Sequence, residues 1–280
     1  MTEVRKGRSD GIMEKKKIRI AFIGGGAIGE AMVQCLLTAK VAAPQDIVVS
    51  DISQVRRDLL SREYGVRALS NNKEAVKNAD LVILAVKPQN LPEVMDEIKG
   101  PSADQLVLSI VAGAALSSLR RGLSHSYVVR AMPNMPAQIG EGMTIWTATN
   151  ETDQRQRKLA QAVLGALGKE IYVADERYLN MATALSSSGP AYVFLFIEAL
   201  VDAGVHIGLP RDMAQALVIQ TVLGSTRMVD KTGRHPADLR NMVTSPGGTT
   251  TEALLELEKG RFRSLLLEAV AAAYRKAECL

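Results

Sequence analysis

Two glycine-rich turns in this sequence have the composition of anion-binding sites. The first lies within Ile18–Met32, where an apolar stretch ending at Ile23 runs into Gly24, Gly26 and Gly29 with the spacing Gly-x-Gly-x-x-Gly. A strand, this turn and a following helix form the fingerprint of dinucleotide sites. The first glycine allows the tight turn, the second lets the backbone approach a pyrophosphate, and the third lets the helix pack against the strand. The helix start, with its free N–H groups, then holds the anion.

The residues that end the second predicted strand bear on which nucleotide would bind. This strand ends at Ser50 and Asp51, the position that contacts the adenosine ribose in such folds. A carboxylate there would accept a hydrogen bond from a free 2′-hydroxyl and repel a 2′-phosphate, which favours NAD. Ser53, Arg56 and Arg57 follow and could bind a phosphate through charge-assisted hydrogen bonds. The two arginines could equally line only the solvent side of the next helix, so NAD and NADP both remain open.

Two further segments are predicted to border the same site. The continuous apolar run Asp80–Val86 is typical of a central parallel strand, and Lys87 and Pro88 follow it on the ligand side of the sheet. Lys87 could act as a general acid, although a lysine at a strand end is usually only a surface charge. In Met132–Pro136, two prolines would hold Asn134 in the wall around the nicotinamide.

The second glycine-rich turn lies in Val243–Glu252. Pro-Gly-Gly precedes Thr249, and Thr249-x-x-Glu252 ahead of an apolar run predicts a capping box. The free N–H groups of this helix start could hold a carboxylate, as the first turn holds a pyrophosphate. An ordinary capped turn would explain the capping box but not the density of hydroxyl groups and glycines. We expect the two helix starts to face each other near the nicotinamide.

Side chains that usually move protons are scarce near these turns. Neither cysteine is placed as a nucleophile, and the three histidines lack metal-ligand spacing, so we expect no metal site. A dehydrogenase acting on alcohols needs a group for the hydroxyl proton, and Lys231 and His235 are the only local candidates. A cyclic imine needs less help, because its nitrogen can arrive protonated and positioning supplies most of the catalysis.

The chain divides into two parts by its pattern of elements. Alternating strands and helices over residues 18–174 predict an α/β, Rossmann-type doubly wound and mostly parallel sheet with its ligand at the carboxyl ends of the strands. Residues 175–280 read as an all-helical domain. Pro190–Leu200 is apolar nearly all round, so we expect a homodimer to bury it; a self-contained bundle is the alternative. Residues 1–17 are polar and basic and are expected to form a flexible tail.

Composition argues against several other classes of protein. The net charge is +4, but the basic residues are spread along the chain and only 4% of residues are aromatic, so nucleic-acid binding is not expected. The two cysteines are far apart and form no disulfide framework, which fits the reducing cytoplasm. No secretory signal is recognisable, and no apolar run reaches the length of a membrane span, so no membrane partner is expected.

Between Ile18 and the last helix, five characteristic segments follow one another: FIGGGAIGEAM, AVKPQ, RAMPNMPAQIGEG, SSSGPAY and HPADLRNMVTSPGGTTTEAL. In these segments and their order, the sequence resembles the pyrroline-5-carboxylate reductase family. The last segment is the most specific, since unrelated Rossmann enzymes lack it. The resemblance implies reduction of the small molecule L-1-pyrroline-5-carboxylate to L-proline, the last step of proline biosynthesis, with NADPH or NADH. It also implies a dimer of swapped C-terminal helices, often assembled into larger rings.

The resemblance also implies roles for individual residues. The hydroxyl of Thr250 is expected to meet the imine nitrogen, and four neighbours would surround the substrate carboxylate: Ser245, Gly247, Gly248 and Thr249. With Asp51, Ser53 and Arg56, the residues expected to contact the cofactor are Gly24, Gly26, Ala27, Ile28, Gly29, Ser50, Asn72, Ala85, Val86, Lys87, Pro88, Ala112 and Gly113.

One departure from the family pattern concerns the nucleotide. Many NADPH-preferring members carry Asn-Arg-Ser/Thr after the second strand, whereas this chain has Asp51-Ile52-Ser53, so NAD(H) is an alternative or additional cofactor. Two other functions stay open. A related reductase acting on another imine or on a β-hydroxy acid would, in its hydroxy-acid form, need Lys231 or His235. A non-catalytic redox sensor would leave Ser245–Thr250 without a use.

Overall fold

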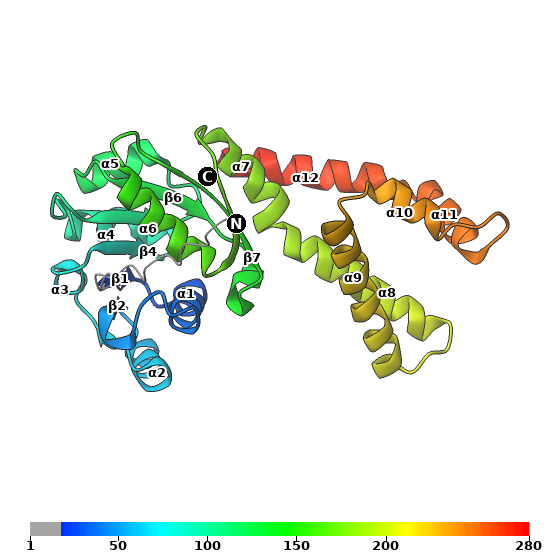
Figure 1. Cartoon of the computed structure of the whole chain (residues 1–280), viewed down its shortest axis with the longest axis horizontal. Coiled ribbons are helices and arrows are strands. Elements are labelled where there is room, and N and C mark those ends of the chain that lie inside the picture. Colours follow the sequence, from blue (N-terminus) through cyan, green and yellow to red (C-terminus); the bar gives the residue numbers. More distant parts are fainter. Residues whose placement is uncertain (1–17, 280) are drawn as a thin grey trace, which may run out of the picture.

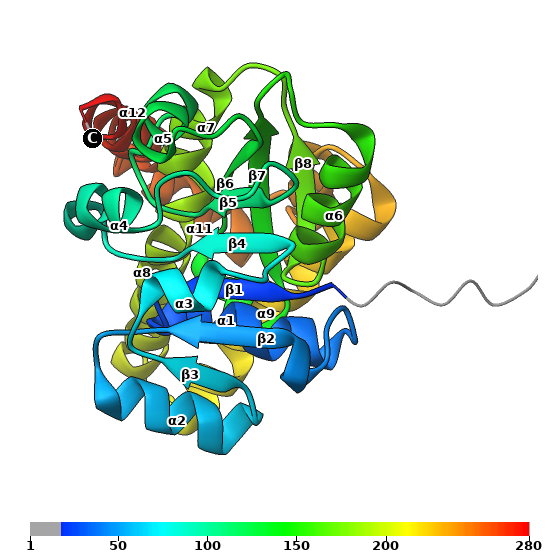
Figure 2. The ribbon, with the colours of Figure 1, turned by 90° about the vertical axis from the view of Figure 1, so that its left-hand side faces the viewer.

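The computed structural model describes residues 18–279, so the predicted tail at residues 1–17 lies outside the described residues. An eight-stranded sheet with the order β3-β2-β1-β4-β5-β6-β7-β8 forms the centre of the first part (Figures 1 and 2). Its strands are β1 (Ile20–Ile23), β2 (Ile47–Ser50), β3 (Arg67–Leu69), β4 (Leu81–Leu84), β5 (Leu106–Ser109), β6 (Val128–Met132), β7 (Gly142–Ala148) and β8 (Gly168–Tyr172). All neighbouring strands are parallel except β6 and β7, which confirms the predicted doubly wound, mostly parallel sheet.

Helices cover both faces of this sheet because its central strands are apolar on both sides. Every residue of β1, β4 and β5 is buried. One face packs against α1 (Ala27–Thr38), α2 (Gln54–Tyr64) and α6 (Gln154–Gly165). The other face packs against α3 (Asn72–Val76), α4 (Leu91–Glu97) and α5 (Leu116–Leu123). This layering leaves the carboxyl ends of the parallel strands free to hold a ligand.

The second part of the chain is helical and projects away from the sheet as two arms (Figure 1). It comprises α7 (Arg177–Ala182), a π-helical turn (Thr183–Ser187), α8 (Gly189–His206), α9 (Arg211–Thr232), α10 (Pro236–Met242), α11 (Thr249–Lys259) and α12 (Phe262–Glu278). Helices α8 and α9 pack together as one arm. The other arm runs out through α10 and α11 and returns along α12, which packs against α7 and the π-helical turn.

A continuous helical run of 30 residues, Arg177–His206, joins the two parts. The apolar pattern predicts two separate helices here, Asp175–Leu185 and Pro190–Ile207. The π-helical turn bridges the expected break and leads directly into α8, whose second residue is Pro190. By length and composition, this run is able to cross a membrane, with a mean hydropathy of 1.4 over 18 residues. The expectation that no segment reaches that length was wrong. Only 11% of the window is buried.

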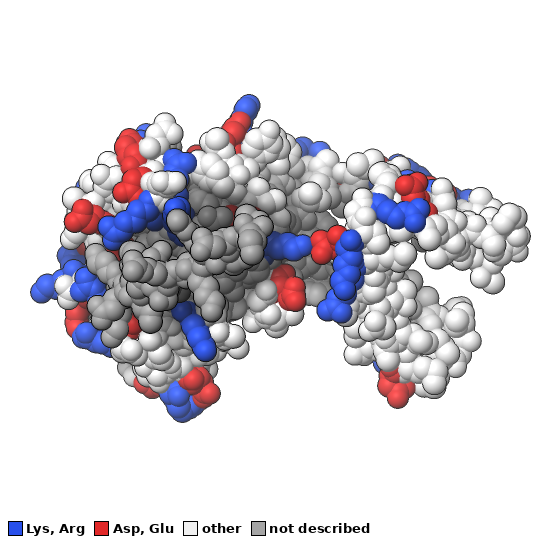
Figure 3. Space-filling model, viewed as in Figure 1, with Lys and Arg blue, Asp and Glu red and all other residues white. Residues whose placement is uncertain are grey.

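Apolar side chains are exposed along both arms, and Figure 3 shows an open gap between two mostly uncharged surfaces. The exposed residues of this apolar surface include, on α8, Val193, Phe194, Leu195 and Phe196; on α9, Met213, Leu217 and Ile219; and on α12, Leu265, Leu266 and Leu267. A surface of this size and composition marks an interaction site. A self-contained bundle, the alternative left open by the sequence, would bury these side chains within one chain, and the structure leaves them exposed.

Other differences from the predicted elements have local causes. Helices α5 and α10 were not predicted, because each is short and follows a turn rather than a long apolar pattern. The amphipathic pattern predicts a helix over Asp153–Leu167, but α6 ends at Gly165, because Gly168 already opens β8. A side chain at Gly168 would collide with the carbonyl oxygen of Gly142, at 2.2 Å, so this glycine allows β7 and β8 to approach closely.

Candidate active site

The glycine turn after β1 has the geometry that its spacing predicts. Gly24 has a φ of +102°, and a Cβ atom there would lie 2.6 Å from the carbonyl oxygen of Ala85. A Cβ atom at Gly29 would lie 2.5 Å from the carbonyl oxygen of Gly24. Gly26 differs, because within residues 18–279 no atom beyond its own chain neighbours lies within 4 Å of its Cβ position. Gly24 and Gly29 are therefore required by the fold, whereas the space beside Gly26 is free for a ligand.

Helix α1 begins at Ala27 with Gly26 as its N-cap, so its first turn includes Ala27, Ile28 and Gly29. The sequence pattern predicts a start at Gly29, so the helix begins two residues earlier than expected. No side chain caps this end among the described residues, and its first N–H groups remain available for an anion. This is the arrangement that a pyrophosphate requires.

A cleft of about 630 Å³ runs along the carboxyl ends of β1, β2 and β4. Ten of the residues predicted to contact the cofactor line it: Gly24, Gly26, Ser50, Asp51, Ser53, Arg56, Asn72, Ala85, Val86 and Lys87. Ser50 lines this cleft although the residue is only 1% exposed, and its hydroxyl has no hydrogen-bond partner within the described part of the chain. A buried hydroxyl without a partner fits a polar ligand in the cleft. The site thus suits a dinucleotide.

The remaining predicted cofactor residues do not line this cleft. Ala27, Ile28 and Gly29 form the first turn of α1, Pro88 opens a short 3₁₀ helix (Pro88–Asn90), and Ala112 and Gly113 follow β5. The cleft includes six residues that were not predicted: Ile23, Ile52, Asn90, Glu93, Val94 and Glu97. Four of these lie in or just before α4 at the spacing of one helical face. A helix following the central strand could have suggested them.

Charged groups at the outer end of this cleft are bound to one another. The Asp51 carboxylate accepts hydrogen bonds from the N–H groups of Gly25 (2.7 Å) and Ser53 (2.8 Å). The Arg56 guanidinium lies 2.6 Å from the Glu30 carboxylate and also donates to the carbonyl of Gly25. Burial alone would raise the pKa of Glu30, but hydrogen bonds from Arg56 and Tyr64 and the charge of Arg56 hold this pKa below its usual value. Glu30 is therefore ionised at neutral pH.

The loop around Asn134 connects the sheet to the π-helical turn. The Asn134 side chain accepts a hydrogen bond from the N–H of Met143 (2.8 Å) and donates to the carbonyl of Ser186 (3.3 Å). The Ser187 hydroxyl donates to the carbonyl of Pro133 (3.4 Å). This loop is thus held in place at the end of β6, as the two prolines predict.

The second glycine-rich turn forms a helix start, but not a capping box. Helix α11 takes Gly248 as its N-cap, and no side chain in the described part of the chain caps it. The N–H of Gly248 and the hydroxyl of Thr251 both donate to the carbonyl of Ser245, so backbone and side chain together close the turn. Gly247 has a φ of +69°, and a Cβ atom at Gly248 would lie 2.4 Å from the Ser245 hydroxyl oxygen. The predicted capping box was wrong, because Thr249 lies inside the helix.

Within one chain, the two glycine-rich turns lie at opposite ends of the molecule. Figure 1 places α11 at the far end of its arm, away from β1 and α1, and α11 packs against α12. The expectation that the two helix starts face each other was therefore wrong for a single chain. The reason is that α10 and α11 extend along the arm instead of folding back onto the sheet.

His235, the alternative proton donor, caps a helix. Its Nδ1 atom accepts a hydrogen bond from the N–H of Ala237 at the start of α10.

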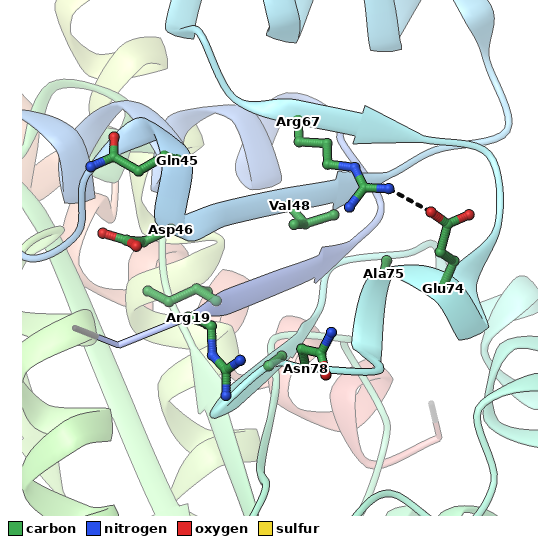
Figure 4. Close-up of a pocket in the computed structure, with 10 residues that line it drawn as sticks. Arg19, Gln45, Asp46, Val48, Arg67, Glu74, Ala75 and Asn78 are labelled. Carbon is green, nitrogen blue, oxygen red and sulfur yellow. Dashed lines mark hydrogen bonds and ion pairs between the residues drawn. The ribbon is translucent and has the colours of Figure 1, made fainter. Parts of the chain in front are cut away.

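A further pocket, of about 210 Å³, lies before the amino ends of β1, β2 and β3 (Figure 4). There Arg67 lies 2.5 Å from Glu74, and Arg19 lies 3.6 Å from Asp80. This pocket is at the edge of the sheet opposite to the predicted ligand site.

Comparisons with known proteins match the chain along almost its whole length. Residues 176–280 match the family model for pyrroline-5-carboxylate reductase dimerisation, and residues 19–113 match that for NADP oxidoreductase, coenzyme F420-dependent. A pyrroline-5-carboxylate reductase of Synechocystis is 43% identical over 93% of this chain and 97% of its own length. That of Arabidopsis thaliana is 39% identical over 93% and 95%.

Solved structures match the fold as well. A pyrroline-5-carboxylate reductase from Coxiella burnetii superimposes with a TM-score of 0.86 at 37% identity, covering 94% of this chain and 98% of that one. The Plasmodium falciparum enzyme, solved with NADP bound, also gives 0.86, at 31% identity and with coverage of 94% and 97%. With its Rossmann-type sheet, its glycine turn and its dimerisation helices, the chain belongs to the pyrroline-5-carboxylate reductase family.

Proposed function

We propose that this protein reduces L-1-pyrroline-5-carboxylate to L-proline, the last step of proline biosynthesis. NADPH or NADH bound along the cleft supplies the hydride. The observation that carries this proposal is the presence of two separate anion-binding helix starts, one lining the nucleotide cleft and one rich in hydroxyl groups. The first suits a pyrophosphate, and the second suits the carboxylate of the substrate.

Thr250 is the proposed catalytic residue of the second turn. Its side chain is half-buried, and its hydroxyl has no hydrogen-bond partner among residues 18–279, whereas the hydroxyl of Thr251 is bound to the carbonyl of Ser245. Thr250 can therefore hydrogen-bond to the ring nitrogen and hold the C=N bond in place for hydride addition. The hydroxyls of Ser245 and Thr249 and the N–H groups of Gly247 and Thr249 would bind the carboxylate. Gly248, whose N–H closes the turn, would let the carboxylate approach the backbone.

The distance between the two turns implies that one chain does not form a complete site. We propose that the substrate turn of a second copy completes the nucleotide cleft of the first. The exposed apolar surface of α8, α9 and α12 supports a homodimer through the C-terminal helices, since a partner would bury it. Such a partner would also cover the apolar run Arg177–His206, so no membrane is required.

Mixed dimers test this shared site. Gly26→Val fills the free space beside the glycine turn, and Thr250→Val removes the proposed catalytic hydroxyl. Each variant alone should retain about 1% or less of the wild-type rate of NAD(P)H oxidation with pyrroline-5-carboxylate. Co-expression should restore about a quarter of wild-type activity, because half of randomly formed dimers are mixed and each of these holds one intact site.

Purification through two different tags isolates the mixed dimers. Their activity should be about half that of wild type, since one of two sites is intact. Mixed dimers that are as inactive as each parent would contradict a shared site. The control is a chain that carries both Gly26→Val and Thr250→Val, co-expressed with wild type. In a shared site, both sites of this mixed dimer combine one intact and one substituted turn, so the mixed dimer should be inactive. One active site in this mixed dimer would show that each site is built from a single chain.

The remaining assignments follow from this function. We place the domain boundary between residues 174 and 175, shortly before α7, and we assign the first domain to the nucleotide and the second to substrate binding and dimerisation. We further propose that the enzyme is cytoplasmic, as its free cysteines fit, and that its dimers assemble into larger rings. Sedimentation velocity of the purified protein measures the assembly directly.

A further inference from the structure

The carboxylate of Asp51 is fixed at the ribose end of the cleft. It lines the cleft directly after β2, and its two oxygens accept the N–H groups of Gly25 (2.7 Å) and Ser53 (2.8 Å). Each carboxylate oxygen has two acceptor positions, so each keeps one for a further donor. A ribose 2′-hydroxyl is such a donor. A 2′-phosphate offers only acceptors and negative charge.

The two arginines near this end are already bound to protein groups. Arg56 donates to the carbonyl of Gly25 through Nε (2.8 Å) and pairs with Glu30 (2.6 Å). Arg57 donates through Nη1 to the carbonyls of Asp51 (2.7 Å) and Ile52 (2.9 Å). Glu30 thus offsets the charge of Arg56, and Arg57 stabilises the backbone at the end of β2. Binding a phosphate would require these contacts to break.

The other charged residues of the cleft add to this effect. Glu93 and Glu97 line it together with Asp51, against Lys87 and the already paired Arg56. Asn72, which could donate to a phosphate, instead donates to Glu97 (2.6 Å). A phosphate monoester carries a charge of about −1.5 to −2 at neutral pH, so a 2′-phosphate here would meet a wall with an excess of carboxylates.

We infer, on the basis of the dinucleotide site proposed above, that this enzyme prefers NADH to NADPH and that Asp51 sets the preference. The carboxylate accepts a hydrogen bond from the 2′-hydroxyl of NADH. It repels the 2′-phosphate of NADPH, and Glu30 strengthens this discrimination because it holds Arg56 against the glycine turn. Attraction for one ligand and repulsion of the other act together here.

Calorimetric titration of the full-length protein with NAD⁺ and with NADP⁺, without substrate, tests the preference independently of turnover. We expect the dissociation constant for NAD⁺ to be lower by at least about tenfold, which corresponds to about 1.4 kcal/mol. Asp51→Asn removes the charge but keeps an acceptor for the N–H of Gly25 or Ser53, and Asp51→Ser is a smaller second variant. Both should shift the ratio toward NADP⁺ by at least about tenfold.

Asp58→Asn is the matched control, because it removes the same charge from α2, the helix that follows Asp51. The Asp58 carboxylate accepts a hydrogen bond from Gln54 and does not line the cleft. This variant should leave the ratio unchanged. A wild-type ratio of one or in favour of NADP⁺ would overturn the inference, as would an unchanged ratio in both Asp51 variants. If both Asp51 variants lose all nucleotide binding, the ratio of the wild-type dissociation constants for NAD⁺ and NADP⁺ alone decides whether the preference exists. Nucleotide discrimination without turnover of pyrroline-5-carboxylate would instead count against the proposed reaction.

Discussion

The guanidinium of Arg130 on β6 lies 2.7 Å from the carboxylate of Glu176, directly before α7, and so links the sheet to the C-terminal helices. The Arg130 side chain is only 7% exposed, and it also donates to Asn180. The same Glu176 oxygen accepts the N–H of Leu116 at the start of α5. This ion pair therefore fixes the direction in which the helical arms leave the sheet.

We predict that Glu176→Ala lowers the free energy of unfolding by about 3 kcal/mol, because it leaves a buried guanidinium without its counter-charge. Arg130→Met should cost less, since it removes the buried charge and fills the space with an apolar chain. Urea denaturation at one fixed protein concentration measures both changes. In the exposed pair Arg120–Glu151, Glu151→Ala should cost less than about 1 kcal/mol. An equal loss in all three variants would contradict this interpretation.

Two alanine substitutions in the glycine turn should have opposite effects. Gly24→Ala places a Cβ atom 2.6 Å from the carbonyl oxygen of Ala85 at a positive φ, so it should lower stability by more than about 1 kcal/mol. The methyl group of Gly26→Ala meets no atom within 4 Å among residues 18–279 beyond its chain neighbours, so stability should be nearly unchanged. Nucleotide binding should weaken, because this methyl group enters the proposed pyrophosphate site. Thermal unfolding and calorimetric titration distinguish the two. Normal binding by a stable Gly26→Ala variant would refute that placement.

The sequence predicted the sheet and the cleft well because their signals are local. Buried strands such as β4 read as continuous apolar runs, and the glycine spacing encodes a backbone conformation that only glycine adopts at Gly24. The π-helical turn at Thr183–Ser187 and the reach of α11 could not be predicted in this way. Both depend on packing between distant segments, namely α12 against α7, and on a surface that is complete only with a second copy.

Substitutions at Thr250 should separate catalysis from folding. Thr250→Val keeps the shape of the side chain but removes the hydroxyl, so we expect kcat to fall by about 10²-fold, the value of one hydrogen bond to a charged group. Thr250→Ser should retain most activity. Thr251→Val serves as the comparison, since the Thr251 hydroxyl bonds to the carbonyl of Ser245 and its loss should affect stability first. Unchanged turnover in Thr250→Val would remove the catalytic role of this residue.

Glu30 should make stability depend on pH in the acid range. Its pKa in the folded protein lies below the usual value, so its ionised form stabilises the fold above the unfolded pKa of about 4.3, and this stabilisation is lost as the pH falls through the folded pKa. Glu30→Gln should therefore lower the urea midpoint at pH 7, and the difference from wild type should shrink as the pH falls below the unfolded pKa and through the folded one. Glu63→Gln, in an exposed pair with Arg62, should show little difference at any pH. A constant Glu30→Gln deficit at every pH would contradict this linkage.

A charge on the apolar surface should separate the subunits and abolish activity together. Leu195 on α8 is 66% exposed, so Leu195→Glu should not disturb the fold of one chain, but a carboxylate in an apolar dimer interface is costly to bury. We expect sedimentation velocity to show monomers, and pyrroline-5-carboxylate reduction to be lost because each cleft lacks the substrate turn of a second copy. NAD⁺ binding should survive, since Leu195 does not line the nucleotide cleft. Val55→Glu, on an equally exposed apolar residue of α2, is the control and should remain a dimer. An active monomer of Leu195→Glu would show that one chain is sufficient for catalysis, and would exclude the shared site.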